Sequence, residues 1–241
     1  MQIKGKRVTI VGLARSGQAA ARLAVQQGAA VRVSDCRPAS AMDADFLAWL
    51  SSEKISAEFE RHTEKGVCDS DLLVVSPGVR YDADPLKWAR ARGIPVVGEL
   101  EFASWFCPCP VVAVTGSNGK TTVTTLIGRV FAEAGRKVFV GGNIGRPLSD
   151  EVLMLSPEHV VVLEVSSFQL ETIDSFHPRA AVFLNISQNH LDRHADMDEY
   201  LQAKKRIFKN QTAQDTAILN AADPVTASLA SSLVPEVVWF N

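Results

Sequence analysis

Short apolar runs alternate along the chain with longer stretches in which apolar residues recur at helical spacing. The runs predict buried strands, and the stretches predict helices that place their apolar residues on one face. Strands are predicted at residues 8–11, 31–34, 71–75, 94–97, 110–114, 138–140, 160–163, 181–184, 217–219 and 237–240. Helices are predicted up to residue 27 after a glycine turn at 12–17, and at 85–92, 123–134 and 200–209. This alternation predicts an α/β fold with parallel, doubly wound sheets.

Polar or small residues follow several of the predicted strands directly. Gly12, Asp35 and Ser76 each come just after an apolar run in the first part of the chain. Ligands of such sheets bind beyond the carboxyl ends of the strands. We therefore expect these three residues to face one crevice.

The first glycine turn, residues 12–17, reads Gly-Leu-Ala-Arg-Ser-Gly. It is a degraded form of the dinucleotide fingerprint G-x-G-x-x-G, because Ala14 stands where the second glycine belongs. Three interpretations stay open: an NAD site that uses Asp35, a tight turn without a ligand, and a site for another nucleotide or phosphate-bearing ligand. In the third, Asp35 and Arg37 would contact the base or ribose.

A second glycine turn, residues 115–119, lies between a predicted strand and a predicted helix and is followed by Lys120 and Thr121. This order is typical of a phosphate-binding loop, in which backbone N–H groups and the helix N-terminus hold an anion. Lys120 would neutralise the β- and γ-phosphates, and Thr121 would hold Mg²⁺. Val114 stands where G-x-x-x-x-G-K-[ST] requires glycine, so the loop is a variant. The alternative is an ordinary turn before a helix.

Further candidate residues lie downstream. Glu164 ends an apolar run, where phosphate-loop enzymes place a carboxylate associated with Mg²⁺; the alternative is a solvated glutamate. His190 and His194 have the i, i+4 spacing of a helical zinc site, but no third ligand is evident. Basic residues of the last predicted helix are most simply a solvated face: Lys204, Lys205, Arg206 and Lys209.

The composition limits the class of protein. With 241 residues, 46% of them apolar and 22% charged, the chain is typical of a soluble globular protein with one large or two modest domains. We place a boundary near Gly98, which gives domains 1–98 and 99–241. A net charge of −2 argues against nucleic-acid binding. No apolar stretch approaches the roughly 18 residues of a membrane span, and the N-terminus lacks the shape of a signal peptide.

The cysteines do not form a metal-binding pattern. Only Cys107 and Cys109 are close in the sequence, and no second pair completes a zinc site. Together with Cys36 and Cys68 they are interpreted as reduced thiols of a cytoplasmic protein.

Four segments together resemble the Mur ligases, the ATP-dependent amide-forming enzymes of peptidoglycan synthesis: residues 115–122, 141–145, 164–171 and 189–193. The resemblance extends from Lys4 to Phe240. The run 164–171 is most similar to the member that joins D-glutamate to UDP-N-acetylmuramoyl-L-alanine. Sister enzymes that add a diamino acid carry a histidine where Phe168 stands, and folylpolyglutamate synthases share the loop but lack this run.

The resemblance implies a Rossmann-like N-terminal domain for the UDP substrate and a central phosphate-loop ATPase-like α/β domain. It implies ATP, two Mg²⁺ sites, a cytoplasmic monomer, and a role in cell-wall biogenesis, cell shape and cell division. The implied ATP-binding residues are Gly116, Ser117, Asn118, Gly119, Lys120, Thr121 and Thr122. Lys120 would hold the transferred phosphoryl group, Thr121 and Glu164 one Mg²⁺, and His190 and a carbamylated Lys204 the second. The implied substrate contacts are Asn143 and Ser166 for the muramoyl part, Ser16 for the pyrophosphate, and Asp35, Arg37, Ser76 and Gly78 around the uracil.

One departure from the family concerns length. Family members carry a third, C-terminal domain, and this chain ends before it, so we expect a truncated central domain and an inactive fragment. Three other hypotheses stay open: another Mur-type ligase, an NAD-dependent oxidoreductase supported only by residues 12–17 with Asp35, and a non-catalytic nucleotide-binding module.

Overall fold

The computed structural model describes residues 2–187 and 194–241. The chain forms two compact units, Met1–Phe106 and Cys107–Asn241. The division lies eight residues after the boundary expected near Gly98, because the intervening helix α5 (Glu99–Ser104) belongs to the first unit.

The first unit is a five-stranded parallel sheet in the order β3-β2-β1-β4-β5. The strands are β1 (Arg7–Val11), β2 (Ala30–Ser34), β3 (Ser56–Glu58), β4 (Leu72–Val75) and β5 (Val96–Gly98). The helices are α1 (Arg15–Gln26), α2 (Ala44–Ser52), α3 (Glu64–Cys68), α4 (Asp84–Ala91), α5 and a 3-10 turn, Ala39–Ala41. This is the strand order of a Rossmann-like sheet. Successive strands are added on one side of β1 up to β3, and then on its other side from β4.

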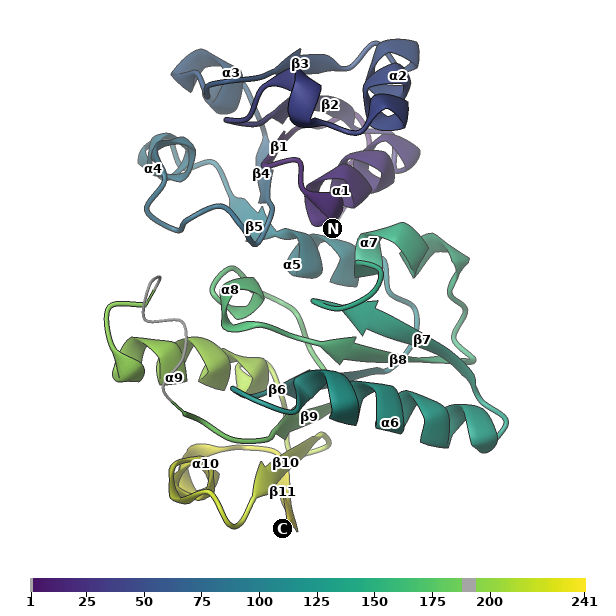
Figure 1. The fold of residues 1–241 in the computed structure, drawn as a ribbon, viewed down its shortest axis with the longest axis vertical. Coiled ribbons are helices and arrows are strands. Elements are labelled where there is room, and N and C mark those ends of the chain that lie inside the picture. Colours follow the sequence, from purple (N-terminus) through teal and green to yellow (C-terminus); the bar gives the residue numbers. More distant parts are fainter. Residues whose placement is uncertain (1, 188–193) are drawn as a thin grey trace. The chain divides into compact units, whose positions relative to one another are not determined.

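The second unit is a six-stranded parallel sheet in the order β11-β10-β9-β6-β8-β7 (Figure 1). Its strands are β6 (Val111–Thr115), β7 (Lys137–Gly142), β8 (His159–Glu164), β9 (Ala180–Phe183), β10 (Thr216–Asn220) and β11 (Glu236–Phe240). Its helices are α6 (Lys120–Glu133), α7 (Leu148–Glu151), α8 (Ser167–Leu170), α9 (Met197–Lys205) and α10 (Pro224–Ser228), with 3-10 turns at Val152–Met154, Arg206–Phe208 and Leu229–Ser232. Strand β6 lies between β8 and β9, so ligands are expected beyond its carboxyl end.

The predicted α/β fold with parallel sheets is confirmed, and each predicted strand coincides with one in the structure. Central strands are recognisable because they are buried on both faces and consist of continuous apolar residues. The boundaries differ most in two helices. Helix α6 begins at Lys120, three residues earlier than predicted. The helix predicted over 200–209 is α9, which ends at Lys205, followed by a 3-10 turn.

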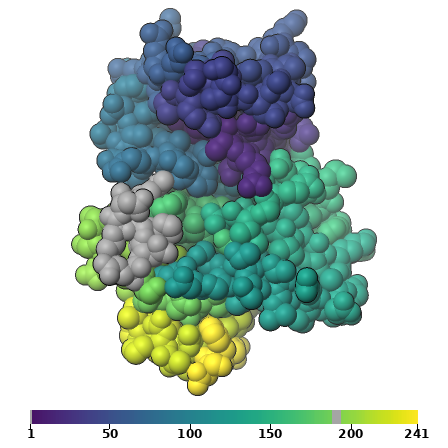
Figure 2. All heavy atoms as spheres, viewed as in Figure 1, coloured from purple at the N-terminus to yellow at the C-terminus, as the bar shows by residue number. Residues whose placement is uncertain are grey.

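Helix α6 covers part of one face of the second sheet, where Val123 and Ile127 pack against Val114 and Val182 of β6 and β9. Its outer side is at the surface, drawn in teal in Figure 2, and includes Leu126, which is 58% exposed. Among the described helices, including this one, none is both long and apolar enough to cross a membrane.

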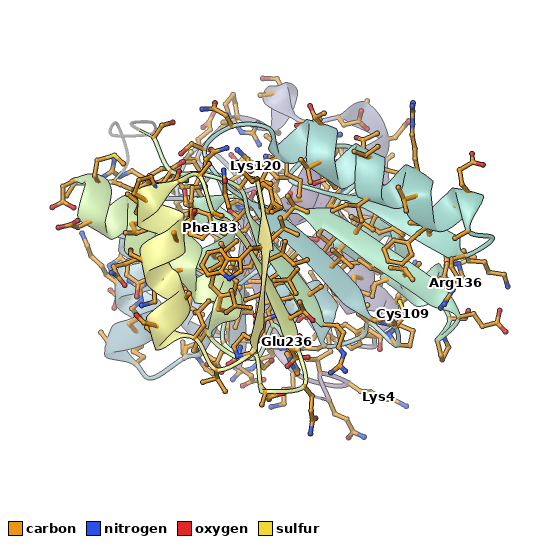
Figure 3. The ribbon with its side chains drawn as sticks, turned by 90° about the horizontal axis from the view of Figure 1, so that it is seen from below. Lys4, Cys109, Lys120, Arg136, Phe183 and Glu236 are labelled. Carbon is orange, nitrogen blue, oxygen red and sulfur yellow. The ribbon has the colours of Figure 1, made fainter. Side chains whose placement is uncertain are left out.

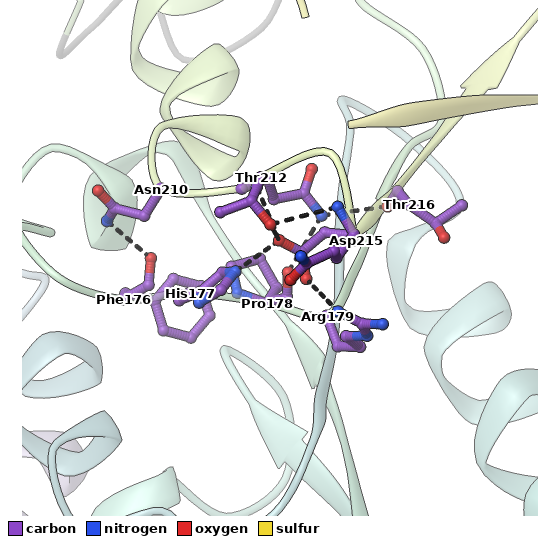
Figure 4. Close-up of polar contacts among 10 residues, drawn as sticks. Phe176, His177, Pro178, Arg179, Asn210, Thr212, Asp215 and Thr216 are labelled. Carbon is purple, nitrogen blue, oxygen red and sulfur yellow. Dashed lines mark hydrogen bonds and ion pairs between the residues drawn. The ribbon is translucent and has the colours of Figure 1, made fainter. Parts of the chain in front are cut away.

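A polar cluster joins the amino-terminal ends of β9 and β10 around Asp215, whose side chain is buried (Figure 4). One carboxylate oxygen lies 2.7 Å from His177 Nε2 and accepts hydrogen bonds from the backbone N–H and the hydroxyl of Thr212, at 2.7 and 2.8 Å. The other accepts from Arg179 at 3.1 Å. Burial alone would raise the pKa of Asp215, but these hydrogen bonds outweigh it and hold the pKa well below its usual range. The cluster lies at the amino-terminal ends of these strands, whereas the phosphate loop lies at the carboxyl end of β6.

Candidate active site

The loop between β6 and α6 has the backbone of an anion-binding turn. Gly119 precedes the helix with φ +80°, a conformation that side chains rarely adopt, so glycine is required there. A Cβ at Gly116 would lie 3.0 Å from Leu184 Cβ, which leaves little space for any other residue. The loop therefore places the N-terminus of a 14-residue helix, with its unbonded N–H groups, at the carboxyl end of the central strand.

Residues that follow β9 hold this loop in place. Asn118 N–H donates to Asn185 Oδ1 at 2.9 Å, and Asn185 Nδ2 donates back to the Asn118 carbonyl at 3.1 Å. The hydroxyl of Ser117 donates to the Ser187 carbonyl and accepts from the Ser187 N–H. The Tyr200 hydroxyl lies 3.3 Å from the same Ser117 oxygen. Sequence reasoning did not assign these contacts; the available signal was a polar Asn185 at the end of an apolar run.

Two ammonium groups meet at the base of the loop. Lys120 Nζ donates to the carbonyls of Gly116 and Ser117 at 3.0 and 2.9 Å. Lys204 Nζ donates to the same Gly116 carbonyl at 2.9 Å. Burial lowers the pKa of Lys120, against the attraction of Glu164. Burial, followed by the charge of Lys120, lowers the pKa of Lys204 to about 7, also against the attraction of Glu164.

The interpretation of the last helix as a uniformly solvated basic face is wrong. Lys204 is 1% exposed, because α9 turns this side chain towards the loop. Arg206 donates to the Leu170 and Ile173 carbonyls. An aliphatic stem long enough to reach backbone acceptors allows a lysine to be buried, and a count of charges along the helix does not reveal this.

Glu164 is not a solvated strand-end residue, since it is 3% exposed. Its Oε2 accepts a hydrogen bond from the Thr121 hydroxyl at 2.7 Å, and its Oε1 accepts from Asn143 Nδ2 at 2.7 Å. Thr121 of α6 and Asn143 of the loop after β7 therefore both contact Glu164 of β8, and all three residues were predicted from the sequence as site residues.

A cavity of about 340 Å³ opens over these groups. Its lining contains most of the residues expected from the sequence: Ser117, Asn118, Gly119, Lys120, Thr121, Thr122, Asn143, Glu164, Ser166, Ser167, Phe168 and Lys204. Ser166 caps α8 in a reciprocal capping box with Gln169. The expected His190 lies outside the described residues.

His194, considered above as a zinc ligand with His190, is buried in a different environment. Its Nε2 lies 3.0 Å from the Ser167 hydroxyl. Its ring stacks on Phe168, with ring centroids 5.6 Å apart, and tilts against Tyr200. These contacts connect α9 with α8 beside the cavity.

In the first unit, the residues expected to share a crevice lie at the ends of neighbouring strands β1, β2 and β4. The buried carboxylate of Asp35 accepts hydrogen bonds from the Leu13 N–H at 2.5 Å and, at both oxygens, from Arg37. Burial would raise the pKa of Asp35, but these bonds outweigh it and lower the pKa. A Cβ on Gly12 would lie 3.1 Å from Ser76 Cβ.

The remaining predicted residues of this unit differ in exposure. Ser76 is buried, Ser16 is half-buried and Gly78 is exposed. A Cβ on Gly17 would overlap the Gly12 carbonyl, so this turn requires glycine where α1 passes close to it.

Comparison with known families finds a match in each of the two units. The family model of the MurD-like N-terminal domain of Mur ligases matches residues 6–98, and that of the Mur ligase middle domain matches residues 114–239. The chain belongs to the Mur ligase family. The family resemblance expected from the sequence is therefore confirmed.

Two curated relatives of this chain share one name. UDP-N-acetylmuramoylalanine--D-glutamate ligase of Geobacter sp. (strain M21) is 51% identical over 235 residues, which are 97% of this chain and 51% of the relative. The ligase of the same name from Geotalea daltonii is 47% identical over 241 residues, which are 100% of this chain and 53% of the relative. The chain thus spans about half the length of the curated relatives it matches.

Solved Mur ligases share the fold. The UDP-N-acetylmuramate:L-alanyl-gamma-D-glutamyl-meso-diaminopimelate ligase from Neisseria meningitides has a TM-score of 0.63 at 18% identity, covering 98% of this chain and 78% of that one. The UDP-N-acetylmuramate-alanine ligase MurC from Thermotoga maritima has a TM-score of 0.52 at 22% identity, covering 97% and 53%. At these identities the likeness supports the fold alone.

Proposed function

We propose that the whole protein joins D-glutamate to UDP-N-acetylmuramoyl-L-alanine at the expense of ATP, in peptidoglycan synthesis. The observation that carries the reaction type is the Glu164 carboxylate, which holds Thr121 and Asn143 at the mouth of a phosphate loop. The substrates are supported by the names of the relatives at 51% and 47% identity. The proposal places the protein in the cytoplasm, since ATP and UDP-sugars are cytoplasmic, and the expectation of a monomer is kept as part of it.

The cavity suits the triphosphate of ATP and a hard cation. Its donors to a cation are the oxygens of Thr121 and Glu164, the ligand type that Mg²⁺ prefers. Residues 116–122 would hold the phosphates through backbone N–H groups and the α6 N-terminus. Bound Mg²⁺ would neutralise charge on the phosphate oxygens. A second Mg²⁺ would be held by His190 and a carbamylated Lys204.

Carbamylation of Lys204 is consistent with its surroundings. Carbon dioxide reacts with the neutral amine and not with the ammonium ion, and burial lowers the pKa of Lys204 to about 7. The neutral amine is therefore more accessible at neutral pH than that of an ordinary lysine. The product is an anion, which would remove the repulsion between this side chain and Lys120.

The reaction requires activation of a carboxylate, because a carboxylate and an amine do not condense in water. We propose transfer of the γ-phosphoryl group of ATP to the alanyl carboxylate, followed by attack of the D-glutamate amine and release of phosphate. Lys120 would stabilise the charge on the transferred group. Asn143 and Ser166 in the cavity lining would orient the muramoyl part.

The first unit would bind the UDP end of the substrate. Ser16, at the amino-terminal turn of α1, would meet the pyrophosphate. Asp35, Arg37, Ser76 and Gly78 would surround the uracil. The Asp35–Arg37 ion pair supports this role, because it fixes a carboxylate and a guanidinium before the ligand arrives.

The test uses a chimera in which this chain replaces the matching half of the Geobacter relative. We expect phosphate release that requires Mg²⁺-ATP, the UDP-muramoyl-alanine substrate and D-glutamate together. L-Alanine with UDP-N-acetylmuramate and meso-diaminopimelate with the D-glutamyl product serve as competing substrates. Preference for either would replace the D-glutamate assignment by another Mur-type ligase. A folded chimera that binds ATP without releasing phosphate would favour a non-catalytic module.

A further inference from the structure

Two cysteine thiols lie close together in the segment that leads into β6. The Sγ atoms of Cys107 and Cys109 are 3.7 Å apart, and Cys107 Sγ lies 3.5 Å from the Cys109 carbonyl oxygen. Both side chains are half-buried. Pro108 and Pro110 fix φ at alternate positions, so the proximity of the sulfurs is built into a stiff backbone. Figure 3 shows Cys109 and Lys120 at opposite ends of the second sheet.

We propose that Cys107 and Cys109 form a reversible disulfide when the protein meets a hydroperoxide. The site does not depend on the proposed ligase function, because it lies at the amino-terminal end of β6 and the phosphate loop lies at the carboxyl end. The sulfurs have to approach by less than 2 Å to reach a bonded separation of about 2.05 Å.

The reaction balances in two steps. The thiolate of one cysteine attacks one peroxide oxygen, the O–O bond breaks, and that cysteine becomes a sulfenic acid while the other oxygen leaves and takes up a proton as water. The sulfur of the second cysteine then attacks the oxidised sulfur, and the sulfenic oxygen leaves as a second water with the thiol proton. Two thiols and one hydrogen peroxide give one disulfide and two waters, so the sulfurs lose the two electrons that the peroxide gains.

The closeness of the two thiols keeps them from ionising together. Burial and the neighbouring Cys107 raise the pKa of Cys109 to about 12, because two negative charges 3.7 Å apart repel each other. One sulfur therefore attacks as a thiolate while the other keeps its proton. Oxidation of the first sulfur to an uncharged sulfenic acid removes this repulsion, so the second thiol then loses its proton more easily and becomes the resolving thiol.

A disulfide fits this pair better than a metal ion does. Two thiolates 3.7 Å apart could also bind one tetrahedral metal, but in the parts of the chain that the structure describes no group of three His, Cys, Asp or Glu side chains could hold one. A ring closed across a single residue is strained, and strained disulfides are reduced readily. Reversibility therefore follows from the spacing.

The test oxidises the chain with stoichiometric hydrogen peroxide and follows the tryptic peptide 93–120, which contains both cysteines. Its background is the double variant C36S/C68S, so that only the pair can react. We expect the peptide to lose two hydrogen atoms, to become resistant to N-ethylmaleimide, and to recover both properties with dithiothreitol. Adding either C107S or C109S should leave the remaining cysteine as a sulfenic acid that dimedone traps, because no second sulfur is present to displace the oxygen.

Each result decides the proposal, with circular dichroism confirming that all variants are folded. Oxidation of the pair to sulfinic acids, or disulfides only between two molecules, would overturn it. So would dimedone labelling of the intact pair at the same rate as in the single-cysteine variants, because the second sulfur would then fail to displace the sulfenic oxygen. ATP binding by the same samples is independent of these outcomes and tests the proposed function separately.

Discussion

Lys120 and Lys204 donate hydrogen bonds to the same acceptor, the carbonyl oxygen of Gly116, at 3.0 and 2.9 Å. Two ammonium groups on one oxygen repel each other, and this repulsion contributes to the lowered pKa of Lys204. A carbonyl carries only a partial negative charge, whereas a phosphate carries a full one. Anion binding in the cavity should therefore relieve a repulsion that the protein itself balances only partly.

Lys120→Ala should weaken ATP binding by about 10- to 100-fold, the equivalent of one charge-assisted hydrogen bond. Isothermal titration of the chain with Mg²⁺-ATP measures this. Arg129→Ala, an exposed position on the same helix, is the matched control and should bind normally. In the chimera, turnover should fall on the order of 10²-fold or more. Near-normal turnover would remove Lys120 from the site.

Lys204→Ala should abolish ligation by the chimera, and a small carboxylic acid added in trans should restore part of it. Lys205→Ala should change turnover less than about twofold, since surface substitutions away from a site have small effects. Lys205 is the neighbour on the same helix and is only half-buried. Equal, mild losses in the two variants would mean that Lys204 serves packing alone.

Glu164→Gln should remove most of the Mg²⁺ dependence of ATP binding, because an amide is a far weaker ligand for a hard cation than a carboxylate. The measurement is ATP affinity with Mg²⁺ and with EDTA. Glu158→Gln, at an exposed ion pair with Lys137, is the control and should keep the wild-type ratio. A Glu164→Gln chain with an unchanged ratio would contradict the assigned cation site.

The first unit should bind UDP and not NAD, because Ala14 interrupts the dinucleotide fingerprint and Arg37 occupies Asp35. Titration of the chain with each ligand tests this. Asp35→Asn should weaken UDP binding about tenfold or more, the scale of a charged hydrogen bond. The exposed pair of Arg80 and Asp82 supplies the control variant Asp82→Asn. NAD binding more tightly than UDP would reverse the assignment.

Asp215→Asn should lower the free energy of unfolding by about 2 kcal/mol at pH 7, because charged hydrogen bonds to a buried carboxylate are lost. The pKa of Asp215 is lower in the folded than in the unfolded chain, so this contribution is present above the unfolded pKa. It decreases as pH falls below about 4. Urea unfolding of both chains at pH 7 and pH 3 should show the difference shrinking.

The control for that measurement is Asp174→Asn, which breaks an exposed ion pair with Lys209 and should cost less than about 1 kcal/mol. A difference between wild type and Asp215→Asn that stayed constant from pH 7 to pH 3 would show that the carboxylate charge contributes nothing.

The sequence predicted most of both sheets because central parallel strands are apolar on both faces. Strand β3 was missed since it is a short edge strand, and its Ser56 and Ala57 are exposed, which leaves no apolar run to detect. Helix α6 was predicted late because Lys120 and Thr121 are polar, although the helix begins with them. Apolar patterning locates elements by their buried face and does not locate polar helix starts.

The candidate site was predicted unevenly for a related reason. Lys120, Thr121 and Glu164 are recognisable because they follow a glycine turn or end an apolar run. Asn185 and Ser187 act through hydrogen bonds to a loop some 70 residues earlier, and only the order of the strands brings them there. Burial of Lys204 likewise depends on where α9 docks.

The hydrogen bonds from Asn185 and Ser187 to the loop mean that the loop sequence alone does not determine the loop conformation. The conformation depends partly on the residues that follow the neighbouring strand β9. Residues 116–119 grafted alone into another parallel sheet would therefore lose the partners that hold Ser117 and Asn118. Transfer of this anion site to another protein therefore requires β9 and the residues that follow it, paired with β6 in the same register.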